Sequence, residues 1–392
     1  MKALKFIDLF CGVGGFHLAL KELGAKCVFA SDIDADCREV YQNNFGIEPT
    51  GDITKVDEKT IPIHDVLCAG FPCQAFSKAG HRKGVNDPRG TLFYEIIRIA
   101  KHHKPKYMIL ENVRNLAGHD GGNTWKVIRY NLREIGYNVS DEPIIFSPHY
   151  LGIPQHRERV FILCKRKDLG DIPPFTFNKK LKPESDAFSI LQPDNEIENI
   201  SDYKLKKRDK SIIDLWNEFT LIVKNELPGF PIWSEWLKEL NGADNIHSFP
   251  KWKQDFICKN SNLYGSNKKK IDGWLIKALS NPDFNGAKAK FEWQAGKTAE
   301  PNLWNTIMQF RPSGLRAKKP TYYPALVAIT QTSIIGTRKR KLTPRECANL
   351  QSIPNSYKLH TTDRIAYKQL GNSVNVAVVK LFAKLLLKSA NY

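Results

Sequence analysis

The 392 residues of this chain, 42% of them hydrophobic, are enough for one large core and a second, smaller unit. The formal net charge of +18 predicts a polyanionic partner. We find no long apolar segment, so nucleic acid is favoured over a membrane as that partner. A basic enzyme that binds no polyanion is the alternative interpretation.

Cysteine usage and the first residues indicate a cytoplasmic protein. No CxxC pair and no histidine at zinc-finger spacing accompanies the cysteines, so we expect reduced thiols and no metal site. Asp8 and the glycines after it interrupt the first apolar run, which argues against a signal peptide. The cysteines are at positions 11, 27, 37, 68, 73, 164, 258 and 347.

From residue 4 to about 164, short apolar runs alternate with amphipathic ones, which is typical of strands and crossover helices around a parallel sheet. The first predicted strand, "LKFIDLF", runs through the turn "CGVGG" into a helix, "FHLALKELG". A second strand, "CVFASD", ends at Asp32, and a polar helix follows to about Asn44. Strand, glycine turn and helix form the opening unit of an α/β fold.

The loop "GFPCQAFSKAG", at residues 70–80, follows the third predicted strand, "DVLCAGF". A helix over about 91–101 leads to the strand "YMILENV", which ends at Glu111 and Asn112. A helix over about 122–135 and the strands "PIIFSP" and "RVFILC" complete the predicted sheet. Ligands bind at the carboxyl ends of parallel strands, so we expect Cys73 and Glu111 to face one pocket.

The sequence pattern changes between residues 171 and 320. The alternation of apolar and amphipathic runs is lost there, and lysine runs and seven tryptophans appear. We expect a small, largely helical module there, with most of its tryptophans in the core. Apolar runs then reappear, and the last of them is a predicted helix in which Val378, Phe382 and Leu386 recur at helical spacing. We expect this helix to pack on the sheet. The predicted domains are 1–170, 171–320 and 321–392.

The turn "DLFCGVGG" indicates a nucleotide ligand. Gly12 and its neighbours let backbone N–H groups approach a ligand closely, and Phe10 can lie against a flat ring. Asp32, at a strand end, can accept hydrogen bonds from ribose hydroxyls, and Asp52 follows the next strand position. Together they suggest an adenosine-bearing cofactor. The alternative is a turn needed only for packing, with Asp32 and Asp52 as strand-end caps.

Cys73 differs from the other cysteines because Pro72 fixes its backbone and the loop around it is polar. A thiolate becomes a useful nucleophile when another group absorbs the charge as it attacks. Glu111 could hold or share a proton on a substrate ring and make that ring electrophilic, and a pyrimidine fits this chemistry. Three cysteines in or beside apolar runs are expected to be small buried hydrophobes: Cys27, Cys68 and Cys164.

Six ordered motifs carry a resemblance to a known family: "FIDLFCGVGG", "GFPCQAFSKAG", "ENVRN", "QHRERVF", "LTPRECANLQSIP" and "QLGNSV". On these motifs, which cover roughly residues 4–165 and 320–390, the chain resembles the cytosine-5 DNA methyltransferases of bacterial restriction-modification systems. The resemblance implies a Rossmann-like methyltransferase fold. This fold is α/β, with a mostly parallel sheet, helices on both faces and a smaller DNA target-recognition domain.

The resemblance also implies roles for site residues. Cys73 would attack carbon 6 of a cytosine, and Glu111 would bind the ring nitrogen and the exocyclic amine. Arg157 and Arg159 would orient the ring. Ile33 departs from the family's pattern, in which an aromatic residue often lies against the adenine, so weaker cofactor binding is expected. The residues implied to bind S-adenosylmethionine are Phe10, Gly12, Gly14, Asp32, Ile33, Asp52, Ile53, Pro72 and Asn372.

DNA binding follows from the same resemblance. The target cytosine must leave the duplex stack, which costs on the order of a few kcal/mol. We expect Ser77 to contact the DNA backbone and side chains between residues 230 and 330 to read base edges in the major groove. The candidates for phosphate contacts are Arg311, Arg316, Lys318 and Lys319.

We therefore interpret the chain as a monomeric enzyme that methylates carbon 5 of cytosine in a specific double-stranded DNA sequence, beside a cognate restriction endonuclease. A transfer-RNA methyltransferase, which shares most of the motifs, is the main alternative. A catalytically silent DNA-binding relative is disfavoured because Cys73, Glu111 and both motif arginines are intact. A nicotinamide dehydrogenase is disfavoured because GxGxxG is absent.

Overall fold

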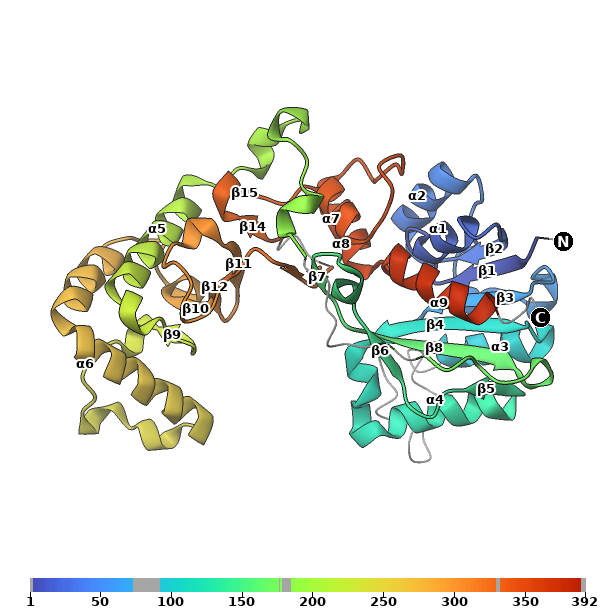
Figure 1. Cartoon of the computed structure of the whole chain (residues 1–392), viewed down its shortest axis with the longest axis horizontal. Coiled ribbons are helices and arrows are strands. Elements are labelled where there is room, and N and C mark those ends of the chain that lie inside the picture. The colour runs from blue at the N-terminus through green and yellow to red at the C-terminus, as the bar shows by residue number, and fades with distance from the viewer. Residues whose placement is uncertain (1–2, 73–91, 176, 178–184, 329–331, 389–392) are drawn as a thin grey trace. The chain divides into compact units, whose positions relative to one another are not determined.

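The computed structural model describes residues 3–72, 92–175, 177, 185–328 and 332–388 (Figure 1). Two predicted site residues, Cys73 and Ser77, lie outside this part of the chain. The chain divides into two compact units. The larger unit comprises Met1–Ser185, Pro324–Thr330 and Pro344–Tyr392, and the smaller unit comprises Asp186–Tyr323 and Gln331–Thr343. The first boundary lies later than residue 170, and residues 331–343 belong to the smaller unit because two strands in them complete its sheet.

The sheet of the larger unit has the strand order β2-β1-β3-β4-β8-β5, with β6 also paired to β8. The first four strands are parallel, and β8 is antiparallel to its neighbours. The strands are β1 (Lys5–Leu9), β2 (Lys26–Ser31), β3 (Val66–Gly70), β4 (Tyr107–Val113), β5 (Tyr137–Val139), β6 (Ile144–Phe146) and β8 (Arg159–Arg166). This arrangement confirms the predicted α/β fold and adds β5, which the sequence analysis missed.

Helices cover both faces of this sheet (Figure 1). Alternate strand residues such as Leu67 and Met108 pack with α3 and α4 in one core, and the residues between them face α1 and α9. The helices of the larger unit are α1 (Gly15–Lys21), α2 (Ala35–Phe45), α3 (Leu92–His103), α4 (Asn123–Glu134), α7 (Pro344–Leu350), α8 (Asp363–Asn372) and α9 (Val376–Lys388). Since both faces are buried, the strands read as continuous apolar runs.

The last helix packs on the sheet as predicted, because the ring of Phe382 in α9 lies 4.7 Å from that of Phe161 in β8. By length and composition the stretch Asp363–Leu387 is apolar enough to cross a membrane. Most of its apolar window is nevertheless buried within the fold, and residues 373–375 interrupt it between α8 and α9. Burial against a sheet accounts for its apolar character.

The smaller unit contains a sheet beside its helices, which the sequence analysis did not predict. It combines the helices α5 (Lys207–Ile222) and α6 (Lys251–Leu279) with a sheet of order β15-β14-β11-β12-β10-β9. Its strands are β9 (Ile232–Trp233), β10 (Lys290–Gln294), β11 (Ile307–Arg311), β12 (Gly314–Lys318), β14 (Ile334–Ile335) and β15 (Arg340–Lys341). Two short strands lie outside both sheets, namely β7 (Gln155–His156) in the larger unit and β13 (Tyr323–Pro324) where the chain passes from one unit to the other.

Tryptophans do build the core of the smaller unit, although fewer are buried than expected. Trp216, Trp274 and Trp293 are buried in one cluster with apolar residues of α5, α6 and the sheet. Trp252 is exposed, and the remaining three are partly buried. The indole rings of Trp216 and Trp274 lie 5.1 Å apart and join the two helices.

Candidate active site

A pocket of about 390 Å³ lies at the carboxyl ends of the parallel strands β1 to β4. It brings together most of the predicted site residues. The described cofactor residues that line it are Phe10, Gly12, Asp32, Ile33, Asp52, Ile53, Pro72 and Asn372, and the described catalytic residues are Glu111, Arg157 and Arg159. The sheet edge is therefore the place where the motifs converge, as expected for an open parallel sheet.

The Asp32 carboxylate stabilises the chain after β1 and the chain after β2 by hydrogen bonds. One carboxylate oxygen accepts a hydrogen bond of 2.7 Å from the backbone N–H of Gly12, and the other accepts one of 2.8 Å from that of Asp34. A carboxylate has about four acceptor positions, so these two bonds leave capacity for ribose hydroxyls. Burial raises the pKa of Asp32, although both backbone N–H groups oppose this shift.

Gly14 does not line the pocket. It adopts a left-handed conformation with φ of +76° and is the residue before α1. A Cβ atom at this position would lie 2.3 Å from the ring of Phe45, so a side chain has no room there. Close packing against α2, together with the backbone conformation, explains this glycine.

One side of the pocket is formed by three residues that follow β2: Ile33, Asp52 and Ile53. Ile33 is 76% exposed, whereas Ile53 is buried. The Asp52 carboxylate accepts hydrogen bonds from the backbone and the hydroxyl of Thr54, which lowers its pKa. Asp52 thus acts as a cap of the short helix that follows, and it also lines the pocket.

Glu111 and Arg159 form an ion pair inside the pocket, with 3.1 Å between Glu111 Oε1 and Arg159 Nε. Glu111 is in β4 and pairs across the sheet with Gly70, the last residue of β3. Burial raises the pKa of Glu111, and the positive charges of Arg159 and Arg157 oppose this shift. A buried carboxyl with a raised pKa can carry a proton or accept one, as general acid–base chemistry requires.

Arg157 makes different contacts from Arg159, although both line the pocket. Its guanidinium donates to the backbone carbonyls of Leu326, Gly371 and Ser373 at 2.8 to 2.9 Å. The side chain is almost completely buried. Arg157 therefore joins two main-chain segments, at Leu326 and on both sides of Asn372, and these bonds favour a positioning role over direct contact with a substrate ring.

Asn112 holds the chain that leads into the Cys73 loop. Its side-chain amide donates a hydrogen bond of 2.8 Å to the carbonyl of Phe71. Asn112 thereby positions the chain that leaves β3. The pocket residues that the sequence analysis did not assign include Ser31, Asp34, Gly51, Leu92, Val113 and Gly371. Asp34 had a local signal, because an aspartate before a helix is a preferred cap.

The four predicted phosphate contacts lie in the smaller unit. Arg311, Arg316 and Lys318 are partly buried on neighbouring strands, whereas Lys319 is exposed just after β12. Arg316 forms an ion pair of 2.6 Å with Glu292. Burial, followed by the nearby charges of Arg316 and Arg311, lowers the pKa of Lys318.

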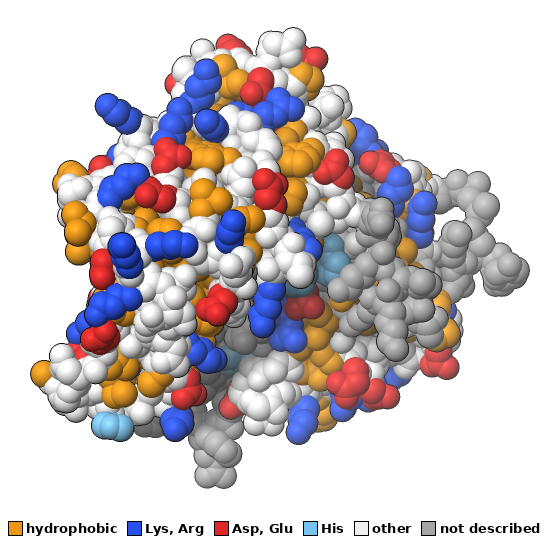
Figure 2. All heavy atoms as spheres, turned by 60° about the vertical axis from the view of Figure 1, so that its left-hand side comes forward, with side chains coloured by type: hydrophobic (Ala, Val, Ile, Leu, Met, Phe, Trp, Pro, Cys, Tyr) orange, Lys and Arg blue, Asp and Glu red, His pale blue; other side chains and the backbone are white. Residues whose placement is uncertain are grey.

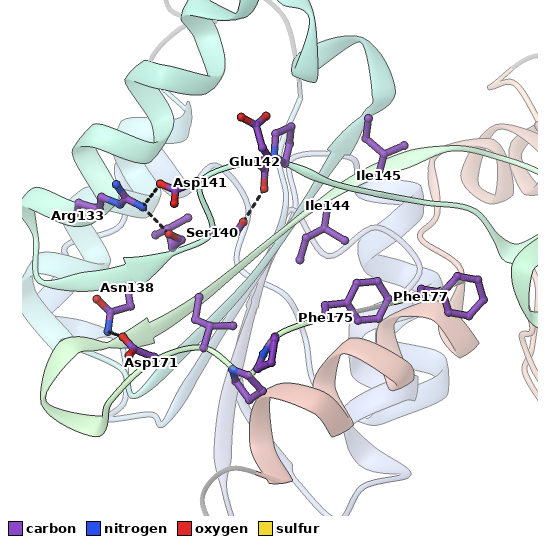
Figure 3. Close-up of a pocket in the computed structure, with 15 residues that line it drawn as sticks. Arg133, Asn138, Ser140, Asp141, Glu142, Ile144, Ile145, Asp171, Phe175 and Phe177 are labelled. Atoms are coloured by element: carbon purple, nitrogen blue, oxygen red, sulfur yellow. Dashed lines mark hydrogen bonds and ion pairs between the residues drawn. The ribbon is translucent and has the colours of Figure 1, made fainter. Parts of the chain in front are cut away.

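A second pocket of the larger unit, about 570 Å³, contains none of the predicted site residues (Figure 3). Arg133, Asp141, Asn138 and Asp171 form polar contacts along one part of it, and Ile144, Ile145 and Phe175 line another. It lies beside β5 and β6 at the antiparallel edge of the sheet. Of these two pockets, the one of about 390 Å³ therefore contains the predicted site residues.

Comparison with known proteins agrees with the motifs and the fold. The family described as C-5 cytosine-specific DNA methylase matches residues 4–388. This chain belongs to that family. It is 34% identical to the type II methyltransferase M.HhaI of Haemophilus parahaemolyticus, with 100% of this chain and 97% of that protein covered. It is 35% identical to M.AluI of Cellulosimicrobium cellulans, with 96% and 90% covered.

Solved structures show the same fold. A putative DNA modification methyltransferase from an Escherichia coli prophage superposes with a TM-score of 0.59 at 18% identity, covering 100% of both chains. The Dnmt2 methyltransferase of Schizosaccharomyces pombe superposes with a TM-score of 0.56 at 18% identity, covering 99% of this chain and 100% of that one. The predicted membership is therefore confirmed, and the chain is a DNA (cytosine-5-)-methyltransferase.

Proposed function

We propose that this methyltransferase transfers a methyl group from S-adenosylmethionine to carbon 5 of a flipped-out cytosine in a specific double-stranded DNA sequence, through a covalent bond to Cys73. One observation carries the proposal. The ion pair between the buried Glu111 and the partly buried Arg159 lies in the same pocket as Phe10, Gly12 and Asp32, so groups suited to a pyrimidine and to an adenosine share one site.

The pocket residues fit S-adenosylmethionine. Asp32 has acceptor capacity for ribose hydroxyls, and Phe10, Ile33 and Ile53 offer apolar surface to an adenine. Asn372 lines the pocket from the C-terminal part of the chain. Bound S-adenosylmethionine would supply a methyl group on a positively charged sulfur, which a nucleophilic carbon can take.

The chain's own residues would make carbon 5 nucleophilic. The Cys73 thiolate forms a bond to carbon 6, and the electron pair of the carbon 5–carbon 6 double bond moves to carbon 5. Glu111 holds the proton on ring nitrogen 3 that favours this step, and Arg159 holds Glu111. Once carbon 5 is methylated, loss of its proton restores the double bond and expels the thiolate.

The position of Glu111 supports a meeting with Cys73. Glu111 is the register partner of Gly70, and Cys73 follows Gly70 by three residues. Three residues of extended chain span at most roughly 11 Å, so this length of chain would allow Cys73 to reach the carboxylate. Asn112 fixes the first of these residues, Phe71, beside β4.

The biological setting follows from the relatives, which are named type II methyltransferases. We propose that the enzyme acts in the cytoplasm and protects DNA against a cognate restriction endonuclease that cuts the same sequence. A monomer suffices for this function, because one chain carries both the reaction site and the smaller, recognition unit.

Bisulfite sequencing of plasmid DNA incubated with the protein and S-adenosylmethionine tests the proposal. We expect cytosines to resist conversion in one short, recurring sequence. Protection without a recurring sequence would contradict specificity. Complete conversion of all cytosines, with methylation found on transfer RNA in the same assay, would establish the alternative RNA function instead.

The Cys73→Ala substitution should reduce methyl transfer by at least ~10³-fold, because no other group would activate carbon 6. DNA affinity, measured by fluorescence anisotropy, should stay nearly unchanged. DNA with 5-fluorocytosine at the target should form a covalent complex with the wild-type protein, since fluorine cannot leave as a proton does. An adduct mapped to another residue, or turnover by the alanine variant, would show that Cys73 is not the nucleophile.

A further inference from the structure

The central strands of the smaller unit have one apolar and one polar face. On β10, β12 and β11, alternate residues such as Phe291, Leu315 and Met308 join the core that includes α5 and α6. The residues between them point to the opposite face. The strand register aligns Arg316 of β12 with Glu292 of β10 on one side and with Gln309 of β11 on the other.

We call this opposite face the polar strand face. Its residues are Lys290, Glu292 and Gln294 of β10, Gly314, Arg316 and Lys318 of β12, and Gln309 and Arg311 of β11. It also contains Ile307, the register partner of Lys318. Four cations thus share the face with a single carboxylate.

The positive charge around the polar strand face favours binding of a polyanion. Residues 301–343 contain eight lysines and arginines and not one Asp or Glu. Lys and Arg side chains are spread among acidic and apolar ones on the side of the molecule that Figure 2 brings forward, so surface charge alone does not single out one site. Crowded, partly buried cations repel one another, and a bound polyanion relieves that repulsion.

Arg316 is the best-fixed cation on the polar strand face. Its Nε and Nη2 atoms contact one carboxylate oxygen of Glu292 at 2.7 and 2.6 Å, and both side chains are largely shielded from solvent. Gln294 also donates to Glu292, at 3.2 Å. A guanidinium in a fixed plane is pre-organised for the two acceptors that guanine presents in the major groove.

We infer that the polar strand face is the surface that reads the DNA sequence in the major groove, with Arg316, oriented by Glu292, as the residue that recognises a guanine. This inference rests on the proposed function. Arg311 and Lys318 flank Arg316 and bind phosphates, which positions the duplex without reading its sequence. The partner is double-stranded DNA, because only paired bases present their edges in an ordered groove.

The Arg316→Lys substitution separates base reading from general attraction. It keeps the positive charge but loses the planar pair of donors. We expect discrimination at one position of the methylated sequence to fall by roughly 10- to 100-fold, as measured by bisulfite sequencing of a randomised target library. Affinity for unrelated DNA and its salt dependence should be unchanged. Glu292→Gln should weaken the same discrimination at the same position.

A matched control is Arg338→Lys, which alters another arginine–carboxylate pair of the smaller unit, with Asp194. Its methylated sequence should be the same as that of the wild type. Lys318→Gln should instead reduce affinity for all sequences and lower the salt slope by about one. Circular dichroism and thermal melting establish that each variant is folded.

The outcomes distinguish the two proposals. If the wild-type protein methylates no DNA, the proposed function is wrong, and this inference is wrong with it. If the wild type methylates one sequence and Arg316→Lys retains the same preference at every position, only this inference is wrong. A loss of activity by Arg316→Lys without any change in sequence preference would also overturn it, because it indicates a structural contribution alone.

Discussion

The sheet of the larger unit is buried on both faces, whereas the central strands of the smaller unit have one core face and one polar face. In the larger unit, the described site residues Asp32 and Glu111 accordingly lie at or near the carboxyl ends of strands. In the smaller unit, functional side chains occupy alternate positions within strands, as Arg316 does. We expect substitutions at the strand ends to change the reaction in every DNA sequence, and substitutions on the polar strand face to change which sequence is methylated.

The Arg159→Ala substitution, at the first residue of β8, should strongly reduce the reaction. Without its partner, Glu111 would be held less firmly and would be a less effective hydrogen-bonding group for the cytosine. We expect the turnover number to fall by roughly 10²- to 10³-fold, equally in all methylated contexts. Steady-state kinetics on two DNA substrates with different flanking sequences measure this. A change in the preferred DNA sequence would contradict the expectation that substitutions at strand ends of the larger unit leave the sequence preference unaltered.

Arg157→Ala should affect the stability of the larger unit more than its chemistry. The substitution leaves the carbonyls of Leu326, Gly371 and Ser373 without their donor. Each buried carbonyl left unpaired costs about 1 to 3 kcal/mol, so the free energy of unfolding should fall by about 3 kcal/mol or more. Urea titration measures this loss. A fully stable variant with reduced turnover would instead place Arg157 at the reacting base.

Acid should affect the stability of the two units differently, because the larger unit buries His17, His64 and His149, whereas the single histidine of the smaller unit, His247, is exposed. Burial lowers the pKa of His17 from 6.5 to about 4. Between these values the unfolded chain binds a proton that the folded chain excludes, so this residue's contribution to stability falls as the pH decreases.

The His17→Phe substitution isolates this effect. It keeps an aromatic ring against Phe45, whose centroid lies 3.8 Å from that of His17. Relative to the wild type, the variant should gain about 2 kcal/mol of unfolding free energy between pH 7 and pH 5. The comparison must be made between the two proteins, since carboxyls with raised pKa values, such as Asp8 and Glu111, stabilise the fold as the pH decreases. An equal pH dependence of urea unfolding in both would contradict the prediction.

The two sheets also differ in how well sequence alone predicts them. Continuous apolar runs located β1 to β4, so the positions of Asp32 and Glu111 could be predicted. The three residues of β5, and the two-residue strands β9, β14 and β15, are too short to give a pattern. Alternation is visible in "KFEWQ" and "GLRAK", but nothing local shows that these strands pair in parallel.

Contacts between residues far apart in the sequence could not be predicted from the motifs. The family resemblance implied that Arg157 orients the base, a role that stays a prediction, but no motif showed that its carbonyl acceptors lie 169 to 216 residues further along the chain. The resemblance also implied that Gly14 contacts the cofactor, whereas Gly14 is not among the residues that line the pocket. The ring of Phe45, which excludes a side chain there, belongs to the next helix. Motifs identify residues that matter, whereas tertiary contacts decide what each residue does.

The smallest effect is expected at Ile33, where the side chain is 76% exposed and lines the pocket after β2. Replacing it with tryptophan provides a ring that can stack on an adenine, which is worth about 0.5 to 1.5 kcal/mol. The dissociation constant of S-adenosylmethionine, measured by calorimetry, should fall by roughly 2- to 10-fold, with the methylated sequence unchanged. Ile63→Trp is the matched control, because Ile63 is 82% exposed and does not line the pocket. Equal affinity in both variants would mean that the adenine does not bind beside Ile33. It would contradict the assignment of the cofactor to the strand ends of the larger unit.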